Sequence, residues 1–152
     1  MIEPTRILVV DDHPAIREGI VSLLEENPEL TVCGEARHGE EALQLIAAMP
    51  RPPQVALMDI HMPVMDGVDC TRELVGRYGR QIGVLVLSME NQAMYIRKML
   101  QAGASGYILK DCDKIELYVA IEFVSRGKTH FSAALSEGIS EINPDPEKDK
   151  DA

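Results

Sequence analysis

The 152-residue sequence lacks several features that would place it in other classes of protein. It has no apolar run near the ~20 residues of a membrane-spanning helix, and its N-terminus lacks the apolar centre of a signal peptide. Cysteine is scarce: Cys33, Cys70 and Cys112 are odd in number, scattered, and without C-x-x-C or Cys/His metal spacing. We therefore expect a soluble protein of the reducing cytoplasm that does not contact a membrane.

Positive charge is also scarce, because 15 Lys and Arg face 25 Asp and Glu and the formal net charge is −10. Nucleic-acid binding relies on clustered Lys and Arg, so this segment is not expected to grip a nucleic acid itself. The glycine-rich loops G-x-G-x-x-G and G-x-x-x-x-G-K are missing as well. Asp11 and Asp12 stand where such a loop would be, and they repel a phosphate unless a cation intervenes. A flavin- or nucleotide-binding module is therefore disfavoured.

What the chain does contain is an alternation of two patterns. Short apolar runs, typical of strands buried on both faces, cover residues 7–10, 30–33, 55–58, 82–87 and 107–109. The longer segments that follow them carry apolar residues at helical spacing, and the last such set is Ile115, Val119 and Phe123. Pro14 suits a first helical turn and Gly103 a helix end.

Alternating strands and helices with short connections predict an α/β fold with a doubly wound, five-stranded parallel sheet and helices on both faces. Ligands bind such sheets beyond the carboxyl ends of the strands. Residues 128–140 still contain Phe131, Leu135 and Ile139, and we expect this C-terminal extension to lie against the last helix. Residues 141–152 carry five acids and two lysines, which is typical of a solvated acidic tail or linker.

The paired acids Asp11 and Asp12 end the first apolar run. Adjacent carboxylates repel each other unless they are solvated or neutralised by a cation. Mg²⁺ fits, because it takes few carboxylates and keeps several waters. The alternative is an ordinary turn, with Asp12 or His13 capping the helix that starts near Pro14.

Three more polar residues end strand-like runs: Asp59 after VALM, Ser88 after VLVL, and Lys110 after GYIL. Taken separately, Asp59 fits a turn residue, Ser88 a helix or turn cap, and Lys110 a surface lysine whose aliphatic stem lies along apolar surface. Together with the acidic pair they favour Mg²⁺-assisted phosphoryl chemistry. Asp59 would keep one oxygen free as a nucleophile, while Ser88 and Lys110 stabilise the charge of the phosphoryl oxygens.

The segments VVDDHPAIREGI, MDIHMPVMDG, VLVLSMEN and AGASGYILKD resemble the receiver domain of bacterial two-component response regulators. DDHP, LSM and VSRGKTHFS are similar to the nitrate-response and nitrogen-fixation subfamily, whose receiver precedes a LuxR-type helix-turn-helix domain. The resemblance implies a flavodoxin-like (CheY-like) fold over residues 1–127 and phosphorylation of Asp59 by a sensor histidine kinase. It also implies Mg²⁺ ligation by Asp11, Asp12, Asp59 and the His61 backbone carbonyl.

The same resemblance makes Ser88 a contact of the phosphoryl group and a switch residue, Lys110 a second phosphoryl contact, and Tyr107 the switch aromatic. Such a domain catalyses only its own phosphorylation and dephosphorylation, so it is not a turnover enzyme. It would form a homodimer on phosphorylation and reach DNA only through a helix-turn-helix domain that does not follow in this sequence. The bulky Met89 after Ser88 predicts hindered access of small phosphodonors.

Three other interpretations remain for this sequence. An excised receiver and a stand-alone single-domain regulator differ only in the missing effector domain. A phosphatase of the haloacid dehalogenase type also uses Asp, Ser, Lys and Mg²⁺, but its nucleophile lies in a D-x-D after the first strand, whereas here the candidate nucleophile Asp59 follows the third. A non-phosphorylated interaction module is less favoured, because every expected site residue is present.

Overall fold

The computed structural model of the protein describes residues 3–132 and residue 135. These residues form one parallel sheet in the order β2-β1-β3-β4-β5-β6. Its strands are β1 (Thr5–Val10), β2 (Leu30–Ala36), β3 (Val55–Met58), β4 (Gly83–Ser88), β5 (Gly106–Leu109) and β6 (His130–Phe131). The α-helices are α1 (Pro14–Glu25), α2 (Gly39–Ala48), α3 (Gly67–Tyr78), α4 (Ala93–Ala102) and α5 (Lys114–Ser125), and the short 3-10 helix η1 (Gly79–Gln81) follows α3.

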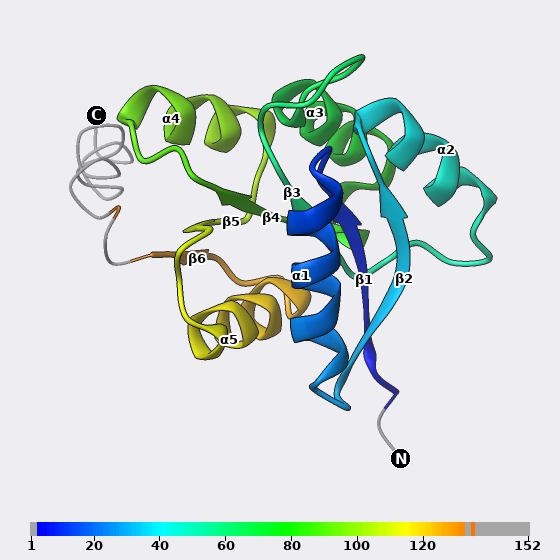
Figure 1. Cartoon of the computed structure of the whole chain (residues 1–152). Coiled ribbons are helices and arrows are strands. Elements are labelled where there is room, and N and C mark those ends of the chain that lie inside the picture. Colours follow the sequence, from blue (N-terminus) through cyan, green and yellow to red (C-terminus); the bar gives the residue numbers. More distant parts are fainter. Residues whose placement is uncertain (1–2, 133–134, 136–152) are drawn as a thin grey trace, which may run out of the picture.

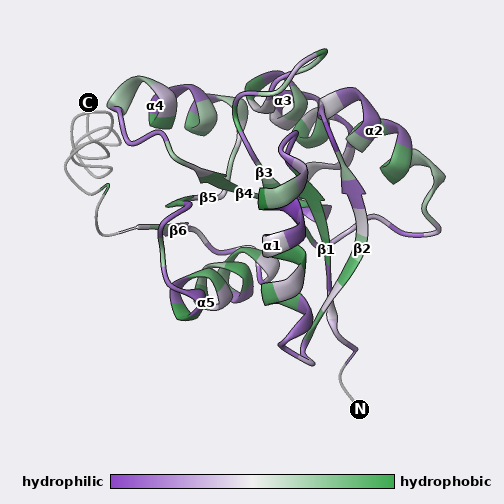
Figure 2. Ribbon diagram, in the orientation of Figure 1, coloured by the Kyte–Doolittle hydropathy of each residue, from purple (hydrophilic) through white to green (hydrophobic). Residues whose placement is uncertain are grey.

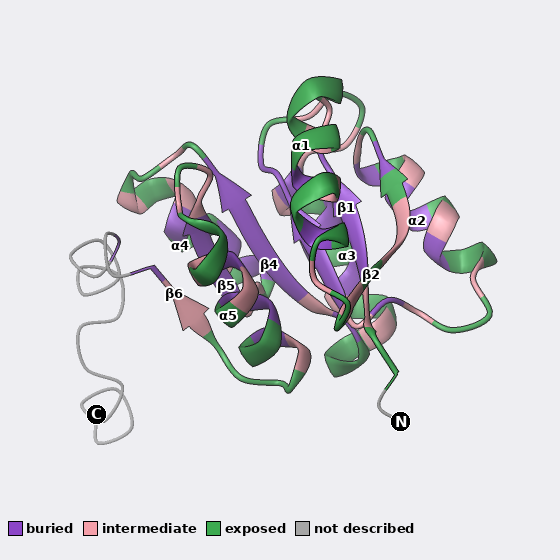
Figure 3. Ribbon diagram, turned by 60° about the horizontal axis from the view of Figure 1, so that its bottom comes forward, coloured by how far each residue is buried: buried purple, intermediate pink, exposed green. Residues whose placement is uncertain are grey.

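Helices cover both faces of the sheet, as Figure 1 shows. Along β1, Ile7 and Val9 pack in one core layer with residues of α1 and α5, whereas Leu8 and Val10 pack in another with residues of α2, α3 and α4. This alternation follows from the two-residue period of a strand. The central strands are hydrophobic in Figure 2 and buried in Figure 3, while the outer surfaces of the helices are exposed. The expected doubly wound α/β fold is confirmed.

The strand order creates a crevice at one edge of the sheet. From β1 the chain passes to its neighbour β2 on one side, and from β3 it passes to its neighbour β4 on the other, so the connections leave the carboxyl ends of the adjacent strands β1 and β3 in opposite directions. This reversal is where ligands bind in open α/β sheets. Among the described residues no helix is long and apolar enough to cross a membrane.

Helix termini follow the local signals in the sequence. Pro14 stands in the first turn of α1, and the Asp66 side chain accepts the backbone N–H of Asp69 at 2.9 Å to cap α3. Gly103 ends α4 with a φ of 108°, a conformation that glycine adopts without a steric cost. These local rules therefore fix where the helices begin, at the functional edge of the sheet, and where they end, at the opposite edge.

The sheet has six strands, whereas the sequence predicts five. The additional strand, β6, pairs in parallel with β5, with His130 opposite Gly106 and Phe131 opposite Tyr107. Two residues are too few to produce a strand pattern, and only the exposed edge of β5 recruits them. The start of the extension does lie against α5, because the His130 ring meets the Phe123 ring with 5.8 Å between centroids, whereas Phe131 and Leu135 pack in the core layer with Tyr107. Ile139 lies outside the described residues.

Helix α5 is present as predicted, but a different face of it is buried. Ile115, Val119 and Phe123 are exposed, and the core positions are Leu117, Ala120, Ile121 and Val124. The sequence KIELYVAIEFVS has apolar residues around most of the helix, so spacing alone does not identify the inner face. Contacts with the sheet decide which face of α5 is buried.

Candidate functional site

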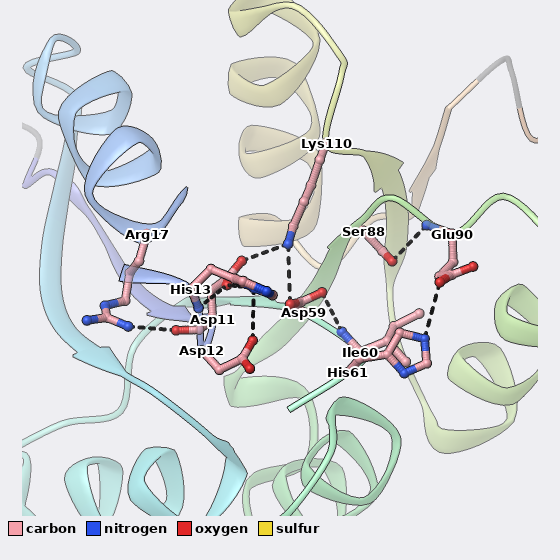
Figure 4. A network of polar contacts seen from close by, with 10 residues as sticks. All are labelled: Asp11, Asp12, His13, Arg17, Asp59, Ile60, His61, Ser88, Glu90 and Lys110. Carbon is pink, nitrogen blue, oxygen red and sulfur yellow. Dashed lines mark hydrogen bonds and ion pairs between the residues drawn. The ribbon is translucent and has the colours of Figure 1, made fainter. Parts of the chain in front are cut away.

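Four side chains gather at the crevice beyond the ends of β1 and β3. Asp11, Asp12 and His13 follow β1 directly, and Asp59 follows β3, where its backbone N–H donates to the Val10 carbonyl at 3.0 Å. One possible ligand atom from each of the four lies within 4.8 Å of the others. Figure 4 shows this convergence, which confirms that the two strand ends bring the three acids together.

Lys110 neutralises part of this acidic cluster from the end of β5. Its Nζ lies 2.9 Å from Asp11 Oδ2 and 3.3 Å from Asp59 Oδ2, with only 10% of the side chain exposed. Burial by itself lowers the pKa of Lys110, but the two carboxylates outweigh burial and raise the pKa above its ordinary value. Lys110 is therefore a fixed positive charge at the site rather than a snorkelling surface lysine.

The two oxygens of the buried Asp59 carboxylate have different partners. Its Oδ1 accepts the backbone N–H of Ile60 at 2.9 Å, and its Oδ2 faces Lys110. Burial raises the pKa of Asp59, and the neighbouring Asp11 raises it further, against the opposing effect of Lys110. The carboxylate is thus held in one orientation, and its negative charge lacks full compensation.

Asp12 provides the test of whether a cation fits. Its Oδ1 is buried and makes no hydrogen bond, although a buried carboxylate oxygen normally has one, and among the described residues its only polar contact is an ion-pair contact with His13 Nδ1 at 3.0 Å. The capping alternative is not observed, because His13 is the N-cap of α1 and no side-chain hydrogen bond caps this helix. An oxygen-preferring divalent ion would satisfy this oxygen, so the donor set of Asp11, Asp12 and Asp59 fits Mg²⁺.

Arg17 is a site residue that sequence analysis missed. From the second turn of α1 its Nη1 donates to the backbone carbonyl of Asp11 at 2.7 Å, and its Nε lies 3.2 Å from Glu35 Oε1 on β2. The guanidinium therefore fixes the peptide that joins Asp11 to Asp12 (Figure 4). No local signal distinguishes Arg17, because its partners are six and eighteen residues away.

Ser88 and Tyr107 do not contact the acids but meet at Glu90. The Ser88 Oγ accepts the backbone N–H of Glu90 at 3.0 Å, and the Tyr107 hydroxyl donates to the Glu90 carbonyl at 2.6 Å. Tyr107 is fully buried, and burial raises its pKa to about 12. The residue expected to be the switch aromatic is therefore buried in this structure.

His61 points its ring away from the acidic cluster. Its Nε2 lies 3.3 Å from Glu90 Oε1, and its ring meets Tyr95 edge-on with 5.1 Å between centroids. The role of its backbone carbonyl as a metal ligand stays a prediction. Met89, next to Ser88 in the chain, is exposed, and the hindered access of small phosphodonors stays a prediction.

Comparison with known proteins gives a consistent result. The response regulator receiver domain family matches residues 7–122. The transcriptional regulatory protein DegU of Brevibacillus brevis is 37% identical over 134 residues, which are 88% of this chain and 56% of DegU. The nitrate/nitrite response regulator NarL of Escherichia coli K12 is 35% identical over 136 residues, 88% of this chain and 61% of NarL. The chain thus spans less than two thirds of these relatives.

A solved structure shares both the fold and the extent of the chain. The crystal structure of a LuxR-family two-component response regulator from Aurantimonas sp. SI85-9A1 superposes with a TM-score of 0.84 at 33% identity. The match covers 94% of this chain and 100% of the other. The sheet that positions the acidic cluster is therefore one already observed in an experimental structure.

Proposed function

Because the chain belongs to the response regulator receiver domain family, we propose that Asp59 accepts a phosphoryl group from a sensor histidine kinase. The observation that carries this proposal is the buried Asp59 carboxylate at the end of β3, between Lys110 and the acids of β1. A carboxylate held in this way is a positioned nucleophile with a fixed cation beside it.

Transfer would proceed by in-line displacement. An Asp59 oxygen attacks the phosphorus of a phosphohistidine, a P–O bond forms, the P–N bond breaks, and the kinase imidazole leaves with the bonding electron pair. Lys110 stands next to Asp59 and would bind one phosphoryl oxygen as negative charge collects there. Hydrolysis of the acyl phosphate restores Asp59, so the domain changes only itself and has no substrate to turn over.

Mg²⁺ would be held by Asp12 and Asp59, with Asp11 assisting and the His61 backbone carbonyl completing the protein ligands. When bound, the ion neutralises the acids and binds phosphoryl oxygens. Asp11 is already engaged by Lys110 and by the backbone N–H of His13 at 2.9 Å, so it would act mainly through water. Asp12, whose Oδ1 is buried and has no hydrogen-bond partner, would be a direct ligand.

The response to phosphorylation would start at Ser88. The Ser88 Oγ accepts the backbone N–H of Glu90, so a movement of Ser88 toward a phosphoryl group on Asp59 would strain or break this hydrogen bond. The segment after β4 would then move, while the buried Tyr107 hydroxyl holds the Glu90 carbonyl. The hydrogen bond from the Tyr107 hydroxyl to the Glu90 carbonyl would be either kept or broken in the phosphorylated state. The surface around α4 would change its shape and so its affinity for a partner.

The whole-protein role follows from the relatives and goes beyond this chain. We propose that the receiver controls a transcriptional effector with a helix-turn-helix domain, through which alone DNA is bound, and that phosphorylated receivers form a homodimer. A stand-alone regulator is the alternative. The cytoplasmic location and a folded unit of residues 1–127 with an extension over 128–140 stay predictions.

The direct test is radiolabel transfer from a phosphorylated histidine kinase, or from a small phosphodonor, in the presence of Mg²⁺. Wild type should gain an acid-stable, base-labile label, and Asp59→Asn should gain none. Asp66→Asn, a change in the exposed cap of α3, is the matched control and should label like wild type. Labelling of Asp59→Asn at another residue would contradict the assignment.

The phosphatase alternative is tested with the same protein. A chromogenic phosphate ester and Mg²⁺ should give no sustained turnover. The nucleophile position disfavours that class, because Asp59 follows β3 rather than β1. Sustained, Asp59-dependent release of phosphate from the ester would favour it.

A further inference from the structure

We propose that the chain after α5 carries the output of the switch: phosphorylation of Asp59 loosens β6 from β5, and β6 in turn favours the unphosphorylated state. The residues concerned are β6 with Ser132 and Leu135, which we call the C-terminal strap. This inference rests on the proposed function, because it starts from a phosphoryl group on Asp59. It goes beyond that function in assigning a regulatory contact to residues outside the five β/α units.

The first observation is how the C-terminal strap is attached to the sheet. The His130 backbone N–H donates to the Ser105 carbonyl at 3.2 Å, and the Ser132 backbone N–H donates to the Tyr107 carbonyl at 3.1 Å. Figure 1 shows β6 beside β5 at the edge of the sheet. A two-residue edge strand held in this way can open without unfolding of the sheet behind it.

The second observation is that the strap enters the core beside the predicted switch aromatic. The Leu135 side chain is 1% exposed and belongs to the same core layer as Tyr107 and as Ile96 and Met99 of α4. Phe131 stands opposite Tyr107 in the register of β5 and β6 and packs against this layer. Because protein interiors are close-packed, a displacement of Tyr107 or α4 changes the surface that Leu135 covers.

The third observation is a continuous series of hydrogen bonds between the phosphorylation site and the strap. The Glu90 backbone N–H donates to Ser88 Oγ at 3.0 Å, and the Glu90 carbonyl accepts the Tyr107 hydroxyl at 2.6 Å (Figure 4 shows the first of these). The carbonyl of the same tyrosine accepts the Ser132 N–H. Tyr107 therefore joins the segment after β4 to the strap, with its hydroxyl at one end and its carbonyl at the other.

The direction of the effect follows from which contacts are closed. All three hydrogen bonds are made while Asp59 carries no phosphoryl group, and a movement of Ser88 toward such a group strains the first of them. A ligand shifts an equilibrium only by its different affinity for the two states, and this coupling is reciprocal. A weaker strap should therefore tighten the binding of a phosphoryl mimic, and the mimic should loosen the strap.

The first experiment measures the affinity for beryllofluoride with Mg²⁺ by NMR titration. Ser132→Pro lacks the N–H that donates to the Tyr107 carbonyl, whereas Ser132→Ala keeps it and is the matched control. Ser132→Pro should bind beryllofluoride at least roughly fivefold more tightly than wild type, and Ser132→Ala should bind like wild type.

A second pair of variants tests the apolar part of the strap. Leu135→Ala should also tighten beryllofluoride binding. Leu43→Ala removes a buried leucine of the same core layer from α2, which packs beside β2 at the opposite edge of the sheet, and should bind like wild type. Equal affinities of Leu135→Ala and Leu43→Ala, or of Ser132→Pro and Ser132→Ala, would overturn the inference.

A direct readout in the full chain is amide exchange at Ser132. Beryllofluoride should speed this exchange at least roughly fivefold in wild type. The increase should be smaller in Tyr107→Phe, which keeps the ring and lacks the hydroxyl that contacts Glu90. Unchanged exchange of Ser132 in wild type would overturn the inference even if beryllofluoride binds. Failure of wild type to bind beryllofluoride, or equal binding by Asp59→Asn, would instead contradict the proposed function.

Discussion

At the scale of single residues, the site is under electrostatic stress that one lysine relieves only in part. Three carboxylates lie within a few ångströms of one another, and Lys110 pairs with two of them. The raised pKa of Asp59 records the remaining cost, of which burial is the largest cause. A residue placed for nucleophilic attack is thus destabilising until a cation arrives.

The pH dependence of stability should expose this cost. An acid whose pKa is raised in the folded state binds more protons there than in the unfolded chain, so stability falls as pH rises from about the unfolded value of 3.8 through the folded pKa. Without Mg²⁺, Asp59→Asn should therefore melt higher than wild type at pH 7, and the difference should shrink below pH 3.8. Thermal melts of both proteins over a pH series measure this difference in melting temperature.

Two comparisons control that prediction. Asp69→Asn removes an exposed acid of α3 and should leave the melting curve within error of wild type at every pH. Added Mg²⁺ should raise the melting temperature of wild type more than that of Asp59→Asn. An Asn variant that melts lower than wild type at pH 7 would mean that the contact with Lys110 outweighs burial.

Arg17 should matter more than its place on a helix surface suggests. Its donation to the Asp11 carbonyl joins a charged group to a part-buried oxygen, and such bonds contribute about 1.5–3 kcal/mol. We expect Arg17→Met to lower the free energy of unfolding by about that amount and to weaken Mg²⁺ binding. Arg37→Met, which removes only an exposed i,i+4 pair with Glu41, should cost less than about 1 kcal/mol. Urea unfolding and Mg²⁺ titration check both variants.

At the scale of elements, the start of α3 supports the loop that follows Asp59. The Gly67 backbone N–H donates to the Ile60 carbonyl at 2.8 Å, so the helix begins directly against the chain that carries the nucleophile. A Cβ at residue 67 would lie 2.0 Å from the Asp59 carbonyl oxygen. Only glycine allows this approach of two backbone segments.

Substitution of two glycines in the same helix separates this contact from helix propensity. Gly67→Ala should destabilise the protein by more than about 3 kcal/mol, or displace Asp59 enough to abolish phosphorylation, because backbone must move. Gly76→Ala has nothing within 4 Å of its Cβ and should be stabilising by about 0.5–1 kcal/mol. Similar denaturation midpoints for the two variants would contradict the role given to the α3 start.

The segment between β4 and α4 should separate phosphorylation from its response. Ser88→Ala keeps Asp59 and Lys110, so the variant should still accept a phosphoryl group. It lacks the hydroxyl that contacts the Glu90 backbone N–H and that would contact a phosphoryl oxygen. Amide exchange over residues 88–110, with and without beryllofluoride, should change in wild type and stay nearly constant in Ser88→Ala. Equal changes in the two proteins would make Ser88 a structural cap.

At the scale of the whole molecule, the chain after α5 contributes to the core. Phe131 and Leu135 pack in the layer that contains Tyr107, and the Ser132 backbone N–H donates to the Tyr107 carbonyl at 3.1 Å. A residue proposed for the switch is therefore covered by a segment outside the five β/α units. The edge of β5 is covered at the same time, which removes a row of unpaired backbone groups.

Truncation at two points tests this contribution. A chain that ends at residue 127 loses β6 and Leu135 and should be less stable by about 2–5 kcal/mol, since burial of one large apolar side chain contributes about 1.5–3 kcal/mol. A chain that ends at residue 140 keeps both and should unfold like wild type. Equal urea midpoints for the two truncated chains would show that the segment adds no stability.

The sequence by itself determined the class of fold and which residues lie at the site edge of the sheet. Asp11, Asp59, Ser88 and Lys110 each follow a short apolar run, and parallel strands place all their carboxyl ends at one edge. Local rules were enough for this, because strand runs, Pro14 at a helix start and Gly103 at a helix end act within a few residues. The convergence of the acids therefore required no knowledge of long-range contacts.

Only the tertiary structure decided the partners of these residues. Three features join positions from different elements: the hydrogen bond of Arg17 to the Asp11 carbonyl, the close approach of Gly67 to Asp59, and the pairing of Phe131 beside Tyr107. The same is true of α5, whose apolar surface extends around most of the helix, so that contact with the sheet selects the buried face. These features depend on packing between distant segments, and neither periodicity nor local signals record which segments will meet.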